Sequence, residues 1–412
     1  MSAPSTTAID GDVSPPLRVL EFYSGIGGMH YSLKRAGVNA NVLAAFEIND
    51  AANAVYRHNF KGAKVVQGLI EGLPAAQFDT YNADIWTMSP PCQPFSRQLH
   101  SKQEGLEDAR SRSFLHILAV LRALTNKPSY ILVENVKGFD ESTARDSLVE
   151  TLTELDYSVR EFLLTPSQYG IPNSRLRYYL VARLDNAFHT AVPTTAQAVR
   201  GGEAPSKPSE TPSSNGDEEV EEKLGGAKPA APVVLAPVGV YTSIPGIADV
   251  PASETRPIRD FLLPNSPGVQ AWKDVEVWKR TPLFDIVTPS STRSCCFTKN
   301  YARYVEGTGS VLQENDQLVI QDIWPTFLER QPLALAQIAE KQPVTSVQNP
   351  LLSLRLRHFD PREVANLMSF PPGPEFTFPN HITRKQRFQL LGNSINVHVV
   401  AKVMQFMLNP ES

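Results

Sequence analysis

The 412-residue sequence lacks the marks of secreted and membrane-spanning proteins. Its three cysteines cannot build a disulfide framework, and they lack the paired spacing of a zinc site. No run of about eighteen apolar residues could span a bilayer. The N-terminus is Ser/Pro-rich and acidic instead of forming a charged-then-apolar signal. We therefore expect a reduced intracellular protein, located in the cytoplasm, with a nuclear pool left open.

An excess of positive charge is also missing, because the formal net charge at pH 7 is -4. Residues 200–228 hold seven acids against four bases, so this stretch supplies -3 of that total. The rest of the chain is nearly neutral. Nucleic-acid binding would therefore have to depend on local basic clusters instead of a global field.

The first half of the chain alternates β-type apolar runs with helical patterns. Strands are expected at residues 17–22, 40–46, 85–88, 130–134, 159–164 and 177–181. Helices are expected at residues 27–36, 50–59, 113–124, 142–155, 361–368 and 397–408, with Asp360 as an N-cap. This alternation predicts an α/β fold with a mainly parallel sheet that is covered by helices on both faces.

Composition divides the chain into segments. Residues 1–16 are expected to be disordered, and residues 17–186 form the α/β domain. Residues 187–237 are rich in Pro, Ser and acidic residues and cannot repay the entropy of ordering, so we expect a disordered insertion. Residues 238–352 are the candidate second lobe, and residues 353–412 return to helical patterns.

A glycine-rich loop follows the first expected strand, with the sequence Tyr23-Ser-Gly-Ile-Gly-Gly28. Such glycines let the backbone pass close to a nucleotide-like ligand before a helix begins. Glu47 ends the next strand, where its carboxylate could accept hydrogen bonds from ribose hydroxyls. A tight turn without a ligand and a solvated acid are the alternatives. The loop departs from Gly-x-Gly-x-x-Gly, which argues against hydride transfer.

Cys92 is surrounded by prolines in the segment Ser89-Pro-Pro-Cys-Gln-Pro-Phe95. The prolines fix the backbone after strand 85–88 and hold the thiol at the carboxyl edge of the sheet, where α/β folds keep their ligands. A cysteine there is useful as a nucleophilic thiolate. The alternative is a buried structural thiol.

Two further motifs place charged side chains near this edge. Strand 130–134 ends in Glu134 and Asn135, and a protonated carboxyl there could donate to a base ring nitrogen. Arg175 and Arg177 have strand spacing, so their guanidinium groups point to one face and could hold a base oxygen, a phosphate or a carboxylate. A helix N-cap pair and exposed edge arginines are the respective alternatives.

Taken in order, these motifs and the late segment Gln389-Leu-Leu-Gly-Asn-Ser-Ile-Asn396 resemble the cytosine-C5 methyltransferase family. The resemblance runs from about residue 17 to residue 408, with a variable region between residues 185 and 353. It implies a Rossmann-like methyltransferase fold that depends on S-adenosylmethionine. The C-terminal segment would complete the catalytic domain, and the small lobe would recognise the target.

The resemblance also implies the residues of the site, without a metal. The catalytic residues would be Cys92, Glu134, Arg175 and Arg177. S-adenosylmethionine would be held by Phe22, Ile26, Gly27, Gly28, Glu47, Ile70, Glu71, Ser89, Asn393 and Ser394. Substrate contacts are expected from Gln93, Lys299, Tyr301, Arg303 and Arg384. Solvated surface charge is the alternative for the basic residues, and core packing is the alternative for the tyrosine.

A stretch in the second lobe narrows the branch of the family. The segment Ser294-Cys-Cys-Phe-Thr-Lys-Asn-Tyr301, followed by Tyr304 and residues 307–310, resembles the Cys-Phe-Thr signature of the branch that methylates cytosine 38 in the anticodon loop of aspartate tRNA. No chromatin-reading or zinc module precedes the α/β domain, which also favours tRNA. Cys295 doubles the cysteine of the signature, and the acidic insertion is a second departure.

The expected substrate is therefore a loop cytosine, which leaves its stack at little cost. The Cys92 thiolate would add to C6, Glu134 would contact N3 and the exocyclic amine, and C5 would take the methyl group. We expect tRNA as the partner, weak DNA binding, no membrane association and a monomer. The alternatives are a DNA (cytosine-5)-methyltransferase, a nucleic-acid-binding protein that retains S-adenosylmethionine with little activity, and a thiol-based redox protein.

Overall fold

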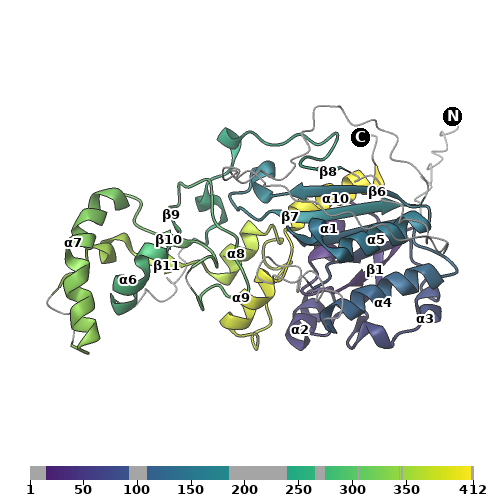
Figure 1. Cartoon of the computed structure of the whole chain (residues 1–412), viewed down its shortest axis with the longest axis horizontal. Helices are drawn as coiled ribbons and strands as arrows, with labels where there is room; N and C mark the ends of the chain where they lie inside the picture. The colour runs from purple at the N-terminus through teal and green to yellow at the C-terminus, as the bar shows by residue number, and fades with distance from the viewer. Residues whose placement is uncertain are drawn as a thin grey trace, which may run out of the picture.

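A computed structural model describes residues 15–91, 109–184, 239–264, 274–304, 306–342, 344 and 347–409. Figure 1 shows a large α/β body with a smaller lobe beside it, and helices α8 and α9 between the two. The expected insertion at residues 187–237 lies outside the described residues, as does the expected N-terminal tail up to residue 14. In the described part of the chain, no helix is both long enough and apolar enough to cross a membrane.

The body is built on one sheet of eight strands in the order β3-β2-β1-β4-β5-β7-β6-β8. Its strands are β1 (Leu17–Phe22), β2 (Ala40–Phe46), β3 (Val65–Val66), β4 (Ile85–Met88), β5 (Tyr130–Val136), β6 (Ser158–Leu164), β7 (Arg177–Arg183) and β8 (Val240–Tyr241). β7 is antiparallel to both of its neighbours, whereas the other pairings are parallel. The predicted α/β fold with a mainly parallel sheet is confirmed.

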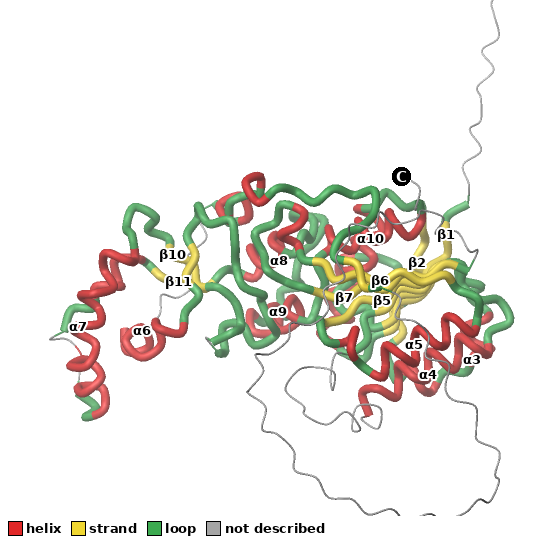
Figure 2. Tube along the Cα trace, turned by 45° about the horizontal axis from the view of Figure 1, so that its top comes forward, coloured by secondary structure: helices red, strands yellow, loops and turns green. Residues whose placement is uncertain are grey.

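Helices cover both faces of this sheet because successive residues of each strand point to opposite sides. Leu20 of β1 faces one core, shared with α3 (Ala75–Asp79), α4 (Ala109–Ala123) and α5 (Thr143–Glu154). Its neighbour Val19 faces a second core, shared with α1 (Gly28–Arg35) and α10 (Val397–Leu408). Figure 2 shows α3, α4 and α5 on one side of the strands and α10 on the other.

Local hydrogen bonds explain where several helices begin. α2 (Asp50–Asn59) starts after Asn49, whose side chain accepts from the Ala52 amide. α8 (Pro361–Leu367) starts after Asp360, which forms a reciprocal capping box with Glu363, as the predicted N-cap requires. α9 (Arg384–Gly392) starts after Thr383, which forms the same motif with Gln386. These caps satisfy amides that have no partner inside the helix.

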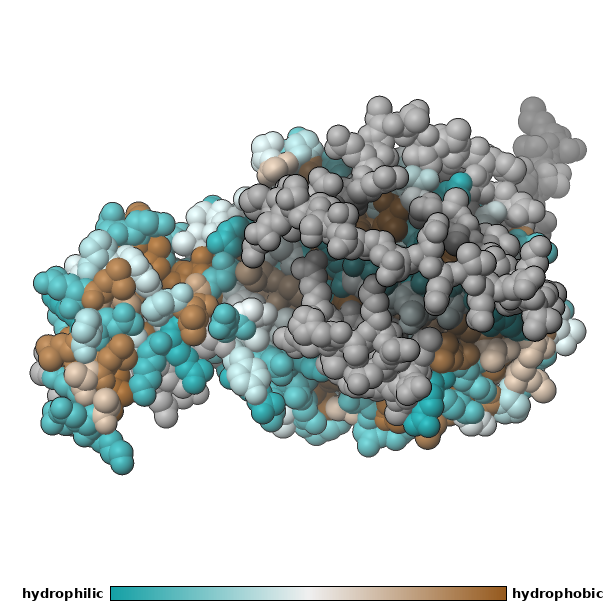
Figure 3. All heavy atoms as spheres, viewed as in Figure 1, coloured by the Kyte–Doolittle hydropathy of each residue, from teal (hydrophilic) through white to brown (hydrophobic). Residues whose placement is uncertain are grey.

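The lobe has its own small core and a sheet in the order β11-β10-β9. It contains α6 (Asp274–Arg280), α7 (Ile320–Ala339), β9 (Ile286–Val287), β10 (Val311–Gln313) and β11 (Leu356–His358). In the described residues of body and lobe, the 3₁₀ helices are η1 (Ile70–Gly72), η2 (Phe139–Glu141), η3 (Pro166–Tyr169), η4 (Ala252–Glu254), η5 (Ile258–Phe261), η6 (Thr281–Leu283) and η8 (Pro350–Leu354). Figure 3 shows apolar surface on this lobe, where α7 exposes Leu328, Leu333 and Leu335.

The body and the lobe are joined by chain crossings and by a shared core. β8 belongs to the segment expected to form the lobe, yet it pairs with β6 of the main sheet. β11 belongs to the segment expected to complete the body, yet it pairs with β10 of the lobe. Phe297 and Tyr301 of the lobe pack in one cluster with residues of α2, α8 and α9. The lobe is therefore attached next to the carboxyl ends of the strands.

Candidate active site

Strand register brings the predicted motifs to one edge of the sheet. Phe22 of β1 is paired with Met88 of β4, and Met88 is paired with Val133 of β5. The next residues along these parallel strands are Tyr23, Ser89 and Glu134. Three motifs that are far apart in the sequence therefore meet at the carboxyl edge, where ligands bind in open α/β sheets.

The glycine-rich loop is tied to Glu47. The amide of Gly25 donates to Oε2 of Glu47 at 3.0 Å, and the amide of Asn49 donates to Oε1 at 2.8 Å. Gly27 has a left-handed φ of 86°, and a Cβ atom there would lie 2.4 Å from the Phe60 ring. The loop therefore cannot accept a side chain at this position, and its backbone stays close to the Glu47 carboxylate.

The C-terminal segment closes against the same loop. A Cβ atom on Gly28 would lie 2.6 Å from Cγ1 of Ile395 and 3.2 Å from the Ser394 hydroxyl oxygen. Ser32 of α1 donates to the carbonyl of Val397 at 3.2 Å. Asn393 is exposed and ends α9. The structure therefore brings Ser394 to the expected cofactor loop, although more than 360 residues separate them in the sequence.

The other expected cofactor residues divide by exposure. Ile26 and Ile70 are buried, and Glu71 is partly buried in η1. The side chain of Phe22 is fully buried and stacks on Phe46 with ring centroids 5.1 Å apart, and its expected contact with the cofactor stays a prediction. The pattern of a strand that ends in an aromatic residue could not show that this ring points into the core.

Residues that the sequence reasoning missed lie beside these positions. Ile48 is 60% exposed and Leu69 is 65% exposed, next to Glu47 and Ile70. The hydroxyl of Tyr23 donates to Ser113 at 3.0 Å, and its carbonyl accepts from Ser89 at 3.2 Å. Large apolar side chains that stay exposed beside a hydrogen-bonding acid would suit a ligand with one flat apolar part.

Glu134 and Arg177 form a buried ion pair at the end of β5. Nε of Arg177 lies 3.7 Å from Oε1 of Glu134, and Glu134 is only 7% exposed. Burial raises the pKa of the Glu134 carboxyl above its usual value, although the charges of Arg177 and Arg175 act in the opposite direction. Glu134 therefore keeps a proton to a higher pH than an ordinary carboxylate does.

Arg175 joins three parts of the chain. Its Nη1 donates to the carbonyl of Phe297 in the lobe at 3.2 Å, and its Nη2 donates to the carbonyl of Gly392 at 3.3 Å and to that of Ser394. Both arginines are largely buried, so the alternative of exposed edge arginines is wrong. Both terminal nitrogens of Arg175 donate to protein carbonyls. Arg175 therefore holds the lobe and the C-terminal segment together at this edge of the sheet.

The lobe adds a thiol to this group. Nη1 of Arg175 lies 3.3 Å from Sγ of Cys296, and Nη2 of Arg177 lies 3.7 Å from it. Burial alone would raise the pKa of Cys296, but the charges of Arg175 and Arg177 outweigh that effect and lower it. The neighbouring thiol differs, because burial and Asp285 raise the pKa of Cys295 to about 11.

The expected substrate residues of the lobe also divide by exposure. Lys299, Arg303 and Arg384 are exposed. Tyr301 is only 4% exposed, and its hydroxyl donates to the carbonyl of Ser310 at 2.7 Å and accepts from the Phe359 amide at 2.9 Å. Tyr301 is therefore a packing residue in this structure, contrary to the expectation that it contacts the substrate directly.

Cys92 and Gln93 lie outside the described residues. The backbone just before them is held by Asn135, whose side-chain amide donates to the carbonyl of Pro90 at 3.2 Å. Asn135 is buried and follows Glu134 directly. The end of β5 therefore fixes both an acidic side chain and the start of the segment that carries the expected nucleophile.

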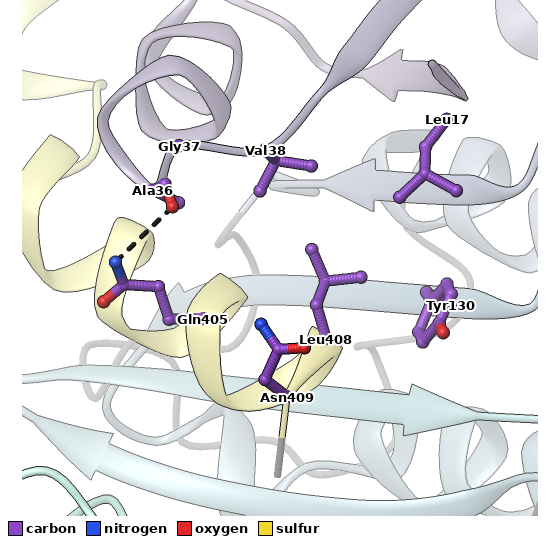
Figure 4. Close-up of a pocket in the computed structure, with 8 residues that line it drawn as sticks. All are labelled: Leu17, Ala36, Gly37, Val38, Tyr130, Gln405, Leu408 and Asn409. Atoms are coloured by element: carbon purple, nitrogen blue, oxygen red, sulfur yellow. Dashed lines mark hydrogen bonds between the residues drawn. The ribbon is translucent and has the colours of Figure 1, made fainter. Parts of the chain in front are cut away.

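A cavity of about 290 Å³ lies at the opposite end of the strands (Figure 4). It is lined by Leu17, Ala36, Gly37, Val38, Tyr130, Gln405, Leu408 and Asn409. Leu17 and Tyr130 are the first residues of β1 and β5, whereas the predicted motifs follow the last residues of these strands. This cavity is therefore separate from the candidate active site.

Comparison with known proteins yields relatives over the whole length of the chain. A family model described as C-5 cytosine-specific DNA methylase matches residues 17–409. The human tRNA (cytosine(38)-C(5))-methyltransferase is 39% identical, over 95% of this chain and 99% of the human protein. A Dictyostelium discoideum protein named DNA (cytosine-5)-methyltransferase is 32% identical, over 96% of this chain and 95% of its own. The crystal structure of the S. pombe Dnmt2 methyltransferase matches with a TM-score of 0.67 and 32% identity, over 96% of this chain and 99% of that one.

These matches include the body, the lobe and the C-terminal helices together. The residues matched by the family model contain every motif that meets at the carboxyl edge of the sheet. Sequence and fold thus lead to the same group of proteins. The chain belongs to the C-5 cytosine-specific DNA methylase family, a family of S-adenosylmethionine-dependent cytosine-C5 methyltransferases.

Proposed function

We propose that this protein is a tRNA (cytosine(38)-C5)-methyltransferase that acts on aspartate tRNA. The observation that carries the proposal is the likeness to the human enzyme of that name over 95% of this chain, which includes the recognition lobe. Within that lobe, Cys296 of the Cys-Phe-Thr segment contacts Arg175 and Arg177. The part of the chain that marks the tRNA branch is therefore in direct contact with the expected catalytic residues.

The glycine-rich loop fits S-adenosylmethionine, which supplies the methyl group in this family. Side chains at Gly27 and Gly28 would collide with Phe60 and Ile395, so this turn requires glycine, as a backbone that approaches a ligand closely does. Glu47 is placed to exchange its bond with the Gly25 amide for bonds with ribose hydroxyls. The exposed Ile48 and Leu69 would cover the adenine, and Ser394 would close the site.

The described residues support separate roles for the side chains that would contact the cytosine. Burial raises the pKa of Glu134, which favours a carboxyl that can share a proton with N3 of the base. Arg177 keeps the carboxyl oriented at 3.7 Å, and Arg175 ties the lobe to the edge of the sheet. The Cys92 thiolate adds to C6 of the cytosine, which makes C5 nucleophilic. When bound, S-adenosylmethionine would supply its methyl group to C5 and leave as S-adenosylhomocysteine. Loss of the C5 proton and elimination of the Cys92 thiolate would then restore the aromatic ring.

The proposal is tested by transfer of a tritiated methyl group from S-adenosylmethionine to aspartate tRNA and to duplex DNA. We expect label in the tRNA alone. The label should be lost with the Cys92→Ala variant, and it should also be lost with tRNA in which cytosine 38 is replaced. Retention of label on the tRNA without cytosine 38 would show that another position is the target.

A second candidate is DNA (cytosine-5)-methylation. It is favoured by the Dictyostelium discoideum relative, which has that name and is 32% identical to this chain. The same assay separates the two candidates, because label in duplex DNA at the level of tRNA would support the DNA activity. If neither substrate is labelled although S-adenosylmethionine binds, the protein is a cofactor-binding protein with little activity.

A further inference from the structure

Two tyrosines of the recognition lobe, three residues apart, have opposite environments. Tyr301 is buried and fully bonded, whereas Tyr304 is 50% exposed. Among Phe, Tyr and Trp side chains in the described part of the chain, Tyr304 is the one that is exposed. An exposed aromatic ring on a loop of the recognition lobe is a candidate contact for a partner with a flat face of its own.

The backbone holds the Tyr304 ring in a defined place. The amide of Tyr304 donates to the carbonyl of Asn300 at 3.2 Å, and its own carbonyl accepts from the buried Thr308 hydroxyl at 2.7 Å. Ala302 has a left-handed φ of 65°, which turns the chain sharply between the two tyrosines. Tyr301 thus anchors the loop in the core while Tyr304 points outward.

Arg303 covers this ring. The centre of its guanidinium group lies 5.1 Å from the centroid of the Tyr304 ring, within the range of a cation–π contact. Arg303 is itself exposed, so its charge remains available to solvent or to a phosphate. The Arg303 guanidinium lies over the ring, and Tyr304 nevertheless stays 50% exposed.

The loop is continuous with the candidate active site. It starts at Cys296, whose thiol contacts Arg175 at 3.3 Å. The backbone of Lys299 lies so close to Gly392 that a Cβ atom there would be 2.1 Å from the Lys299 amide nitrogen. Gly392 in turn accepts a hydrogen bond from Arg175. The exposed ring is therefore attached, through closely packed backbone, to the groups expected to hold the target base.

We propose that Tyr304 and Arg303 form a stacking platform for an unpaired RNA base that flanks the target cytosine. This inference rests on the proposed tRNA methyltransferase function. Every base has a π-face, so an aromatic ring binds single-stranded bases with little sequence preference. A duplex keeps the neighbours of a flipped cytosine stacked inside the helix, whereas a tRNA loop can offer them. The platform would therefore favour loop RNA over duplex DNA.

The test compares Tyr304→Ala, Tyr304→Leu and Tyr304→Phe for binding to aspartate tRNA and for methyl transfer. Stacking of one base contributes enough to change affinity by about tenfold, so we expect Kd and KM for tRNA to rise about tenfold in the Ala and Leu variants. Tyr304→Phe should behave as wild type because it keeps the ring. The rate at saturating tRNA should change little in any of the three.

Two controls separate stacking from other causes. Leu328→Ala removes an exposed apolar side chain from α7 of the same lobe and should leave Kd unchanged. Tyr304→Ala should keep the wild-type salt dependence of binding, whereas Arg303→Ala should reduce it if Arg303 also contacts a phosphate. The Tm of each variant verifies that it folds.

Each outcome bears on a different claim. If wild type methylates tRNA and Tyr304→Ala binds tRNA as tightly as wild type, the platform is excluded and the proposed function stands. If Tyr304→Leu matches wild type while Tyr304→Ala does not, apolar contact replaces stacking and the platform is again excluded. If wild type binds no tRNA, both the proposed function and the stacking platform are excluded.

Discussion

Nε of Arg177 lies 3.7 Å from a carboxylate oxygen of Glu134, and both side chains are largely buried. An arginine this close normally lowers the pKa of a carboxyl, yet burial outweighs it and raises the pKa of Glu134. Glu134 therefore combines a defined position beside Arg177 with a carboxyl that retains its proton to a higher pH than usual. These are the two properties that a proton donor to a base ring nitrogen requires.

Glu134→Gln should lower the rate of methyl transfer by about 10² to 10⁴-fold, the usual contribution of general acid catalysis. The amide keeps the shape and can still form hydrogen bonds with the base, but it cannot transfer a proton. KM for tRNA should therefore change little. Single-turnover methylation measures the effect, and a rate within twofold of wild type would exclude proton transfer by Glu134.

The pH dependence of the same rate has a definite sign. Because the protonated carboxyl is the active form and its pKa is raised, activity should persist above the usual range of a carboxyl and fall as pH rises through that pKa. Glu134→Gln has no such proton and should lose this part of the profile. A wild-type profile that keeps the same falling limb in the variant would assign it to another group.

Arg175→Lys should destabilise the protein and abolish activity. A lysine lacks the planar guanidinium group and cannot donate to the carbonyls of Phe297, Gly392 and Ser394 at the same time. Some of these acceptors would therefore lose their hydrogen bonds. We expect the free energy of unfolding to fall by about 3 kcal/mol. Arg256→Lys is the matched control, because Arg256 is exposed, where it forms an i,i+4 ion pair with Asp260 at 3.0 Å and lies 4.5 Å from the centroid of the Phe261 ring. Equal denaturation midpoints for the two variants would show that the hydrogen bonds of Arg175 do not stabilise the fold.

Glu21 predicts a change of stability with pH. It is buried in β1, accepts a hydrogen bond from Tyr56 at 2.7 Å, and burial raises its pKa to about 8. The folded protein therefore binds this proton more tightly than the unfolded chain does. Its contribution to stability is complete below pH 4.5 and is lost as pH rises to 8, with a slope of up to about 1.4 kcal/mol per pH unit.

Glu21→Gln should remove this slope. Burial lowers the pKa of His30 to about 3, which gives the opposite slope below pH 6.5, so the useful window is pH 6.5 to 8. Urea denaturation across that window should show wild type losing stability while the variant stays flat. Parallel curves would mean that Glu21 is ionised in the folded protein.

Gly28→Ala should lower the free energy of unfolding by about 1 to 3 kcal/mol, because its Cβ would lie 2.6 Å from Cγ1 of Ile395. Adding Ile395→Ala should recover part of this cost, so the two changes should be non-additive. Gly72→Ala is the control, because nothing lies within 4 Å of a Cβ there. Additive effects in the double variant would contradict the contact between the loop and the C-terminal segment.

Strong local patterns made much of the body predictable. The bounds of β1, β2, β4, α2 and α10 match the expected ranges. α7 was missed because Pro325 and Pro332 interrupt its helical pattern, although both prolines lie on its exposed side. α9 could have been found from its capping box, since Thr383 and Gln386 have the required spacing.

Site residues that lie at strand ends could be predicted from the sequence. Site residues that are positioned by contacts between distant parts of the chain could not. Glu134, Arg177 and Ser89 lie at the edge that the strand pattern implies. The contact between Arg175 and Cys296 joins residues 121 positions apart, and no local pattern encodes it. Residue type also could not tell that the aromatic rings of Phe22 and Tyr301 are buried.

The hydrogen bonds from Arg175 to the carbonyls of Gly392 and Ser394 also set an order of events during synthesis. The sheet can form from the first 183 residues, apart from β8, but the cofactor loop is not closed until residues 392–397 pack against Gly28 and Ser32. Those residues leave the ribosome more than 200 residues after the end of β7. A nascent chain can therefore fold most of its body without a finished site, so activity requires that residues 392–397 have been made.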